Sequence, residues 1–530
     1  MIANMAGPSR GHRKFLIASA ITLLLLIYAC NSRGLFVGDN PFWDKISRPS
    51  SPSKSSSAKD VGESIFPDDY RYVSDDQKDC ETFLGASYLT AAAAKQADYC
   101  EASSPSKFHC FLAPRRGGEY KSDPTCLAQG VLYDPNPIES HRTLSESDAA
   151  TPSEAPKPFS LQCTLRNFTN EMLLHPERKD SLADVPPVDK MDVYWFDTGL
   201  GQQMKEWEFD GQREQKCNST DDGWILLVRR EGNTNVWHKL MEPWQAMHSL
   251  DIMQMARNPA TGTPWLSKRD AADVRVVFED DRQEVYDRWW TMVTGNAPIR
   301  RSDLQPGTCF KNVILPMAGS SSPFWSALLE TNYHDPCQTR FLLDTFIRRL
   351  FRFLNIAPRP AGDIHEDPTI TIIDRKKTRR IIDMDSKRQA LERAYPRSQI
   401  NIVDFATITI EDQVRLMQAT DVLVGHHGAG ITNILYLPPD AAVVEIFPPF
   451  FSMRGFRSIA RMRGLTHFAA PSIWPEEYNH TVHGTPLPDG WQRPQTDRTW
   501  QTDEVVYMTD EDFLGYIDGA VRNQKNKKHD

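Results

Sequence analysis

The sequence lacks several patterns that mark common classes of protein. It has no C-x-x-C pair, which argues against a zinc site or a redox motif. Its net charge is −9, and the absence of a basic excess disfavours a general nucleic-acid-binding protein. It shows no internal repeat, and long apolar runs are scarce. With 530 residues it is still long enough for two or three domains with hydrophobic cores.

One uncharged run stands near the N-terminus, from Phe15 to Cys30, behind Arg10, Arg13 and Lys14. As a helix it would span about 24 Å, slightly less than a hydrocarbon core of about 27–30 Å. A signal anchor with its basic side in the cytoplasm fits the positive-inside rule. A cleaved signal peptide also fits, because Ala29 is small, and a buried core helix is the third alternative. We favour the anchor, and the first two alternatives both place the following residues outside the cytosol.

The cysteines and the glycosylation sequons agree with a lumenal address. Eight cysteines follow Cys30, an even number that permits up to four disulfides in a translocated domain. Sequons begin at Asn167, Asn218 and Asn479. The sequence therefore predicts a single-pass type II membrane glycoprotein of the Golgi or endoplasmic reticulum, with most of the chain in the lumen.

Composition and periodicity divide the chain into segments. Arg48–Ser57 is Ser/Pro-rich and has nothing apolar to bury, which is typical of a stem. Apolar runs of strand length and two helical stretches follow residue 159, and from Thr369 strands and helices alternate, which predicts a Rossmann-like parallel sheet. The predicted order is a cytoplasmic tail (1–14), a transmembrane signal anchor (15–35), a stem linker (36–75), a cysteine-containing extension and linker (76–158), a first α/β lobe (159–360), a second α/β lobe (361–500) and a C-terminal tail (501–530).

The elements expected in the two lobes can be given by their ranges. In the first lobe, we expect strands at Val193–Phe196, Trp224–Val228 and Val274–Phe278, and helices at Trp237–Ile252 and Cys337–Leu354. In the second lobe, we expect strands at Thr369–Ile373, Asn401–Phe405, Asp421–Gly425, Ala441–Phe447 and Leu465–Ala469. The helices between them are expected at Ser386–Arg393, Ile410–Ala419, Gly428–Leu437 and Arg454–Arg463, with Ser386 and Thr409 as N-caps.

The strongest local pattern is the segment Asp421–Asn433, DVLVGHHGAGITN. A buried strand ends in a turn containing Gly425, Gly428 and Gly430 and then opens a helix, whose N-terminal amides would face a phosphate. Ligands of doubly wound sheets bind at the carboxyl ends of strands. The alternative is a tight turn that binds no ligand.

Charged residues at neighbouring strand ends support a ligand. Arg375–Arg380 (RKKTRR) directly follows the strand Thr369–Ile373, and the guanidinium groups of Arg375 and Arg380 match phosphate oxygens. Glu445 lies within an apolar strand, where a carboxylate often accepts hydrogen bonds from ribose hydroxyls. The alternatives are a solvated charge run and an exposed edge position.

The segment DVLVGHHGAGITNILYLPPDAAVVEIF resembles the signature of glycosyltransferase family 61. Asn235-x-x-His238-x-x-x-Glu242 is similar to a family pattern that has Asp in its last place. Cys309-Phe310-Lys311, Cys337 and Leu354-Asn355-Ile356 resemble the branch of EGF-domain-specific O-linked N-acetylglucosaminyltransferases. The resemblance covers residues 190–470 and is more specific in the second lobe.

The resemblance implies a GT-B fold, with two Rossmann-like lobes and a cleft between them, and an inverting transfer from a UDP-sugar. Gly428, Ala429 and Gly430 would cradle the diphosphate, Arg375 and Arg380 would neutralise it, and Asn433 and Glu445 would hold the nucleoside. Gly425 and His427 belong to the same donor-binding segment, and Asn235 to the acceptor side. No metal or other cofactor is strictly implied, and the Asp-x-Asp matches at Asp383 and Asp510 are interpreted as capping and tail residues.

Inverting transfer also needs a base for the acceptor hydroxyl. His238 and Glu242 are one helical turn apart, so one is expected to be the base and the other its orienter. The alternative is that His238 packs or binds substrate, in which case Glu279, Asp280 and Asp281 would be the next candidates. We predict transfer of a sugar, first GlcNAc, to a glycoprotein or polysaccharide. A pentosyltransferase using UDP-xylose and a non-catalytic glycan- or nucleotide-binding membrane protein are the alternatives.

Overall fold

The computed structural model describes residues 66–70, 78–135, 157–232, 235–325, 337, 340–449, 451, 453–492 and 505–529. The chain divides into residues 1–63 and a compact unit from Ser64 to Asp530. The expected cytoplasmic tail and anchor therefore lie outside the described residues, as does nearly all of the stem. Within the described part of the chain, no helix is both long and apolar enough to cross a membrane.

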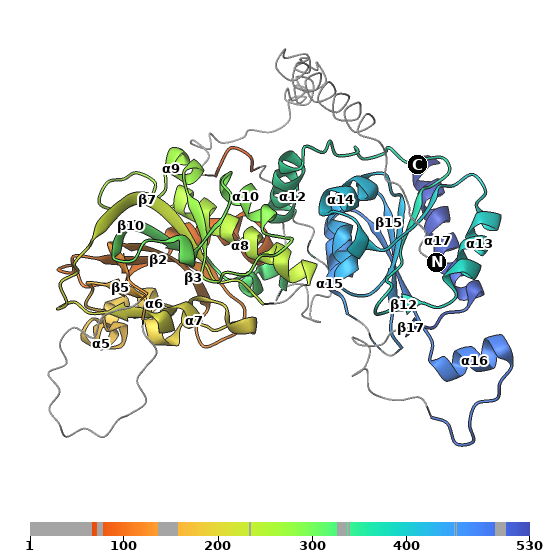
Figure 1. Cartoon of the computed structure of the whole chain (residues 1–530), viewed down its shortest axis with the longest axis horizontal. Coiled ribbons are helices and arrows are strands. Elements are labelled where there is room, and N and C mark those ends of the chain that lie inside the picture. Colours follow the sequence, from red (N-terminus) through yellow and green to blue (C-terminus); the bar gives the residue numbers. More distant parts are fainter. Residues whose placement is uncertain are drawn as a thin grey trace, which may run out of the picture. The chain divides into compact units, whose positions relative to one another are not determined.

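The first lobe contains a ten-stranded mixed sheet with helices packed against it (Figure 1). Its strands are β1 (Gln96–Asp98), β2 (Lys107–Pro114), β3 (Ser122–Gln129), β4 (Val131–Tyr133), β5 (Phe159–Leu161), β6 (Trp207–Phe209), β7 (Ser219–Val228), β8 (Arg275–Phe278), β9 (Ile299–Arg300) and β10 (Thr308–Leu315). Its helices are α3 (Lys78–Leu84), α4 (Ala86–Ala94), α5 (Phe168–Leu174), α6 (Lys179–Leu182), α7 (Leu200–Gln203), α8 (Val236–Met255), α9 (Lys268–Ala272), α10 (Arg288–Thr294) and α12 (Phe341–Phe353).

Only part of this sheet is parallel. Strands β10, β7, β8 and β9 pair in parallel, as do β5 and β6. The pairs β1–β2, β2–β3 and β4–β5 are antiparallel, and β10 is antiparallel to both β3 and β4. The Rossmann-like first lobe expected from the family resemblance is thus limited to the parallel strands. The antiparallel strands come from the segment that the sequence marks only as a cysteine-containing extension, so that extension is built into the lobe's own sheet.

Four disulfides stabilise the first lobe. They join Cys80 to Cys337, Cys100 to Cys163, Cys110 to Cys126 and Cys217 to Cys309. The expected maximum of four is confirmed, and all eight cysteines after Cys30 take part. Disulfides persist in oxidising compartments, so the protein is one of the secretory pathway.

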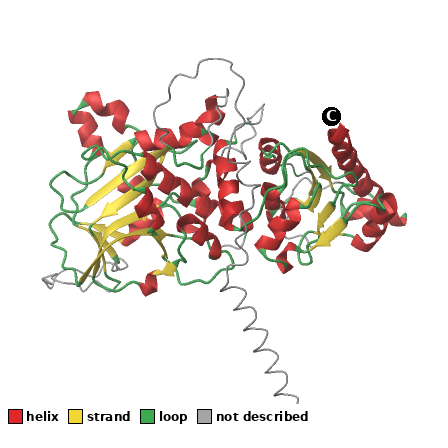
Figure 2. Cartoon of the chain, turned by 90° about the horizontal axis from the view of Figure 1, so that it is seen from above, coloured by secondary structure: helices red, strands yellow, loops and turns green. Residues whose placement is uncertain are grey.

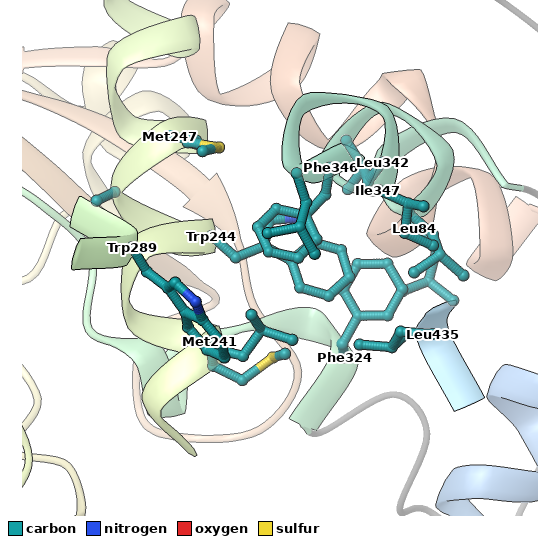
Figure 3. Close-up of a cluster of buried hydrophobic side chains, with 14 of the residues drawn as sticks. Leu84, Met241, Trp244, Met247, Trp289, Phe324, Leu342, Phe346, Ile347 and Leu435 are labelled. Atoms are coloured by element: carbon teal, nitrogen blue, oxygen red, sulfur yellow. The ribbon is translucent and has the colours of Figure 1, made fainter. Parts of the chain in front are cut away.

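A large apolar cluster lies under α8 and continues into the second lobe (Figure 3). Trp244 of α8 stacks between Phe324 and Phe346, with ring centroids 4.3 Å away on both sides. Leu435, from the second lobe, belongs to the same cluster. Burying such large side chains together contributes on the order of 2–3 kcal/mol each, which favours a fixed placement of α8 against the second lobe.

The second lobe is a five-stranded sheet in which every pair is parallel, in the order β13-β11-β14-β15-β16. The strands are β11 (Ile370–Ile373), β13 (Ile400–Val403), β14 (Val422–His426), β15 (Ala442–Phe447) and β16 (Thr466–Pro471), and β12 (Arg380–Ile381) pairs separately with β17 (Val505–Val506). The helices are α13 (Met384–Ala394), α14 (Ile410–Gln418), α15 (Gly455–Met462), α16 (Pro475–His483) and α17 (Asp510–His529). The expected Rossmann-like parallel sheet is confirmed in this lobe.

Helices cover both faces of this sheet, as Figures 1 and 2 show. Along β14, Leu423 packs with residues of α14 and α15, whereas its neighbours Val422 and Val424 pack with residues of α13 and α17. Side chains of a strand alternate between faces, so a strand buried on both faces reads as a continuous apolar run. This is why the sequence pattern identified these strands well.

Some expected elements differ in the structure. Val193–Phe196 is not a strand, because Phe196 has φ 55° and the segment contains a 3-10 turn at Trp195–Asp197. The helix expected at Gly428–Leu437 is a 3-10 helix, Ala429–Tyr436. Ser386 is not an N-cap, because α13 begins at Met384 and the Ser386 hydroxyl instead donates to Asp510, 2.6 Å away. The segment expected to be a C-terminal tail contains α17, which packs on the sheet.

Candidate functional site

The second sheet reverses its strand order between β11 and β14. Strand β13 follows β11 in the sequence but lies on its far side, while β14, β15 and β16 extend in the other direction. Loops that leave the sheet at such a switch point diverge and open a crevice at the carboxyl ends of the strands. Here those ends carry the residues from Asp374 to Arg379 and from His426 to Ala429. The glycine turn and the basic cluster, separated by about fifty residues in the sequence, are therefore neighbours.

Two arginines lie directly against Gly428. A Cβ at this position would collide with the guanidinium of Arg379 and lie 3.4 Å from Nη1 of Arg375. Gly428 also has φ 137°, a conformation that side chains disfavour. Burial lowers the pKa of Arg379 to about 10, with a further contribution from the charge of Arg375, and burial also lowers the pKa of Arg375. Two desolvated cations at one exposed stretch of backbone are suited to binding an anion.

The two lobes enclose a cavity of about 330 Å³ at this turn. From the second lobe, its walls include His427, Gly428, Ala429 and Arg379. From the first lobe, they include Asn235 and His238, the residues predicted for the acceptor side and for catalysis. The other lining residues are mainly apolar: Trp237, Phe324, Trp325, Met453, Gly455, Phe456 and Ile459. The structure therefore brings predicted residues of both lobes together in one apolar-walled cavity: Asn235, His238, His427, Gly428 and Ala429.

His238 is oriented by a carboxylate that the sequence did not reveal. Its Nδ1 is 2.6 Å from Oε2 of Glu231, and the Glu231 side chain is fully buried. Asn235 caps α8, its Oδ1 accepting from the amide of Trp237, so the helix that carries His238 begins at the cavity wall. With Nδ1 engaged by Glu231, Nε2 is the ring nitrogen that can receive a proton.

Glu242 lies behind this pair and does not line the cavity. Its Oε1 accepts a hydrogen bond from the amide of Glu231 at 2.5 Å, and its Oε2 is 3.7 Å from Lys239. Burial raises the pKa of Glu242 to about 8, although Lys239 and the Glu231 amide act in the opposite direction. Glu242 is thus placed to hold the backbone of Glu231, and the carboxylate that contacts the His238 ring is that of Glu231 and not that of Glu242.

Glu445 likewise lies one layer behind the cavity. Its two oxygens are 2.5 Å from Nδ1 of His427 and 2.6 Å from Nε2 of His467. Burial acts to raise the pKa of Glu445, but the hydrogen bonds from the two imidazoles hold it below its usual value. The two imidazoles thus help to keep the buried Glu445 carboxyl ionised. His427, which lines the cavity, is therefore backed by a buried negative charge.

The remaining predicted donor residues have other contacts. Arg380 is exposed in β12 and lines a different cavity with Asp374 and Asp383, whereas its neighbour Arg379 faces Gly428. Asn433 is buried and donates to Gln413 and to the carbonyl of Gly430. A Cβ on Gly425 or Gly430 would press on Ile373, so both glycines permit close packing against β11.

The other candidate bases do not line the cavity either. Glu279 is bound by Gln203 and Arg229, Asp280 by Arg230 and Arg282, and Asp281 accepts from Ser302. The sequence offered weak clues to Glu231 and Arg379: the first follows a predicted strand, and the second lies within the basic cluster. All three sequon asparagines, Asn167, Asn218 and Asn479, are exposed.

Comparison with known proteins finds similarity to glycosyltransferases. A family model described as Glycosyltransferase 61 matches residues 225–444, a range that contains both sides of the cavity. The chain is 27% identical over 177 residues to the EGF domain-specific O-linked N-acetylglucosamine transferase of Xenopus laevis, covering 32% of this chain and 33% of that protein. The protein of the same name in Bos taurus is 26% identical over 346 residues, covering 62% and 60%.

A third relative has a different name. The protein O-linked-mannose beta-1,4-N-acetylglucosaminyltransferase 2 of Tetraodon nigroviridis is 27% identical over 180 residues, covering 32% of this chain and 27% of that protein. In each of these comparisons the match spans less than two thirds of the relative's own length.

Proposed function

We propose that this chain, which belongs to glycosyltransferase family 61 and is distantly related to EGF domain-specific O-linked N-acetylglucosamine transferases, moves a sugar from a UDP-sugar to a glycoprotein or glycan acceptor with inversion. GlcNAc is the sugar that we propose first, because it is named in the relatives of both kinds. The observation that carries the proposal is the cavity in which the His238–Glu231 pair faces the Gly428 turn and its arginines.

The donor side fits a diphosphate. Gly428 presents backbone without a side chain, Arg375 and Arg379 supply guanidinium groups, and His427 is backed by the ionised Glu445. These groups would stabilise the negative charge that develops as the diphosphate leaves. The nucleoside would continue into the crevice at the switch point of the second sheet. A donor lobe and an acceptor lobe on opposite sides of one cavity support our proposal that the enzyme is of the GT-B type.

The acceptor side fits a general base. In the proposed step, the acceptor hydroxyl oxygen forms a bond to the anomeric carbon while the bond from that carbon to the diphosphate oxygen breaks. The hydroxyl proton passes to Nε2 of His238, and UDP leaves with the bonding electron pair. Glu231 fixes the ring through Nδ1 and would stabilise the imidazolium that forms, the role that a buried carboxylate has beside other catalytic histidines.

A panel of UDP-sugars tests the proposal. The full chain is incubated with each donor and with mixed glycoprotein and glycan acceptors, and UDP release is measured together with the anomeric configuration of the product. With UDP-GlcNAc as the donor, we expect UDP to be released and the product to have the inverted anomeric configuration. Preference for UDP-xylose would support the pentosyltransferase alternative. Binding of UDP without release from any donor would support a non-catalytic binding protein and refute the enzyme.

The proposal also includes the subcellular location of the protein. The four disulfides indicate the secretory pathway. We propose that the enzyme resides in the membrane of the Golgi or endoplasmic reticulum, held by the segment 15–35 as a type II anchor with the cavity in the lumen. UDP-sugars and protein acceptors would then meet in the compartment in which the exposed sequons are also glycosylated.

A further inference from the structure

An exposed aromatic turn borders the cavity. Trp195 is 53% exposed and Phe196 is 52% exposed, although large aromatic side chains are usually buried for most of their surface. Both rings lie near His238, with centroid distances of 6.0 Å for Trp195 and 5.7 Å for Phe196. Trp195 also packs edge-on against Trp325, a residue of the cavity wall, at 5.0 Å. The turn therefore extends the cavity wall outward from the proposed base.

The backbone of this turn is held in an unfavourable conformation. Phe196 and Asp197 have φ values of 55° and 54°, in the left-handed region that residues other than glycine rarely adopt. Such conformations persist only where the surroundings enforce them, and they cluster at functional sites. Here the amide of Tyr194 donates to the carbonyl of Thr198 at 2.8 Å, and Arg229 donates to the carbonyl of Asp197 at 2.7 Å. These contacts hold two aromatic side chains half exposed to solvent.

Exposed apolar side chains are also concentrated here. Among the described residues, nine large hydrophobic side chains are exposed; Met453 lines the cavity, and Trp195 and Phe196 lie beside His238, which also lines it. Apolar patches rimmed by polar groups mark binding surfaces. The polar rim consists of Asn235 at the cavity wall and the exposed Asp197 in the turn itself.

The chemistry of the turn favours a sugar over a bare polypeptide. A polypeptide segment brings amide and carbonyl groups, which cost free energy against an aromatic wall unless they find hydrogen-bond partners. Three carbonyls of the turn already accept hydrogen bonds, that of Thr198 from the Tyr194 amide, that of Asp197 from Arg229 and that of Trp195 from the Thr198 hydroxyl, which leaves fewer acceptors for a polypeptide. A pyranose ring has an apolar C–H face that can lie on an aromatic ring, and hydroxyls at its edge that stay in water or meet polar side chains.

We propose that Trp195 and Phe196 form the acceptor platform of this enzyme, on which a sugar residue of a glycan acceptor stacks so that one of its hydroxyls reaches His238. This inference rests on the proposed function and narrows it, since the acceptor then carries a sugar residue next to the hydroxyl that is modified. The platform sets which acceptor binds, whereas the Gly428 turn and its arginines bind the donor.

The test separates acceptor binding from donor binding. The full chain and its Trp195→Ala and Phe196→Ala variants are mixed with methyl α-mannoside, methyl β-glucoside, methyl β-galactoside and methyl β-xyloside. Saturation-transfer NMR then reports binding. Leu174→Ala is the matched control, because it removes an exposed leucine from α5, which does not line the cavity. We expect at least one glycoside to receive saturation through the C–H protons of one ring face in the wild type and the control. Either platform variant should reduce that signal by about tenfold, the scale of losing an aromatic contact.

UDP affinity, measured by calorimetry on the same samples, is expected to stay within about twofold in both platform variants, since the ring contacts of these residues are with His238 and Trp325 of the first lobe. Where transfer is detected, the KM for the glycoside should rise while kcat on saturating acceptor stays near the wild-type value. Absence of glycoside binding to the wild type, or equal binding by both platform variants, overturns the platform. So does efficient transfer to an unglycosylated polypeptide by these variants. Glycoside binding without UDP binding would refute the proposed transferase and leave the platform supported.

Discussion

Replacing Glu242 by glutamine should change how the stability of the protein depends on pH. Burial raises the pKa of Glu242 to about 8, from a usual value of 4.5. A carboxyl whose pKa is raised by folding is protonated in the folded chain and ionised in the unfolded chain between these two values. The folded state then binds more protons than the unfolded state, so stability falls as pH rises through this window. Below about pH 4.5, the usual pKa of a glutamate, the contribution of the protonated Glu242 carboxyl to stability is fully present.

The magnitude follows from the width of the window. One proton contributes about 1.4 kcal/mol per pH unit, so the wild type should lose on the order of 4 kcal/mol between about pH 5 and pH 8 through this residue. The glutamine side chain cannot ionise, and it keeps the carbonyl oxygen that accepts from the Glu231 amide. The Glu242→Gln variant should therefore lose less stability across the same interval, and near pH 8 it should be more stable relative to the wild type than near pH 5.

Urea-unfolding midpoints of protein with intact disulfides, measured from about pH 5 to pH 8, provide the assay. Other buried groups also titrate, so the informative quantity is the difference between the wild type and the variant at each pH. Glu392→Gln is the control, because this glutamate is exposed on α13 and should leave the profile unchanged. Parallel profiles for the wild type and Glu242→Gln would show that Glu242 is ionised in the folded protein and would refute the reasoning.

Three further predictions concern the donor-binding residues, the proposed base and the subcellular location of the protein. Gly428→Val should abolish UDP binding, because the valine side chain would displace Arg379. Arg375→Ala should weaken UDP binding, measured by calorimetry, by on the order of 1.5–3 kcal/mol. If both variants bind UDP with wild-type affinity, the phosphate site lies elsewhere. His238→Ala should lower kcat by about 10²–10⁴-fold with UDP affinity nearly unchanged, and unaltered turnover would exclude His238 as the base. Endoglycosidase treatment of protein from eukaryotic cells should increase its gel mobility, since the sequon asparagines are exposed, whereas an unglycosylated cytosolic protein would contradict the lumenal address.

Local patterns predicted the second lobe more completely than the first. The strands of the parallel sheet are apolar on both faces, and the glycines and caps between them act locally, so β11, β14 and β15 begin and end within one or two residues of the expected positions. Thr409 caps α14 as expected, accepting from the amide of Asp412. The first lobe pairs β10 with β3, β4 and β7, which come from distant parts of the chain. Pairing between segments so far apart in the chain leaves no periodic pattern in the sequence.

The helical spacing of His238 and Glu242 illustrates the limit of a local argument. Residues four apart share a face of the helix, but the spacing does not say which neighbouring element meets that face. In the structure, the loop after β7 inserts Glu231 between them, so Glu231 contacts the histidine ring while Glu242 holds the Glu231 amide. Glu231 lies seven residues before His238 in a loop, and the sequence does not show in which direction a loop side chain points.

The sequence by itself determined the resemblance to glycosyltransferase family 61, the parallel sheet of the second lobe, and the segments that supply the site, because short-range chemistry fixes strands, glycine turns and caps. Only the tertiary structure decided which side chains of those segments meet. It selected Arg379 over Arg380 at Gly428, placed Glu445 behind His427, and surrounded His238 with Trp195, Phe196 and Trp325. The reason is physical: adjacent residues leave a strand end in different directions, and which one faces a cavity depends on the packing of two lobes whose contacts join distant parts of the chain.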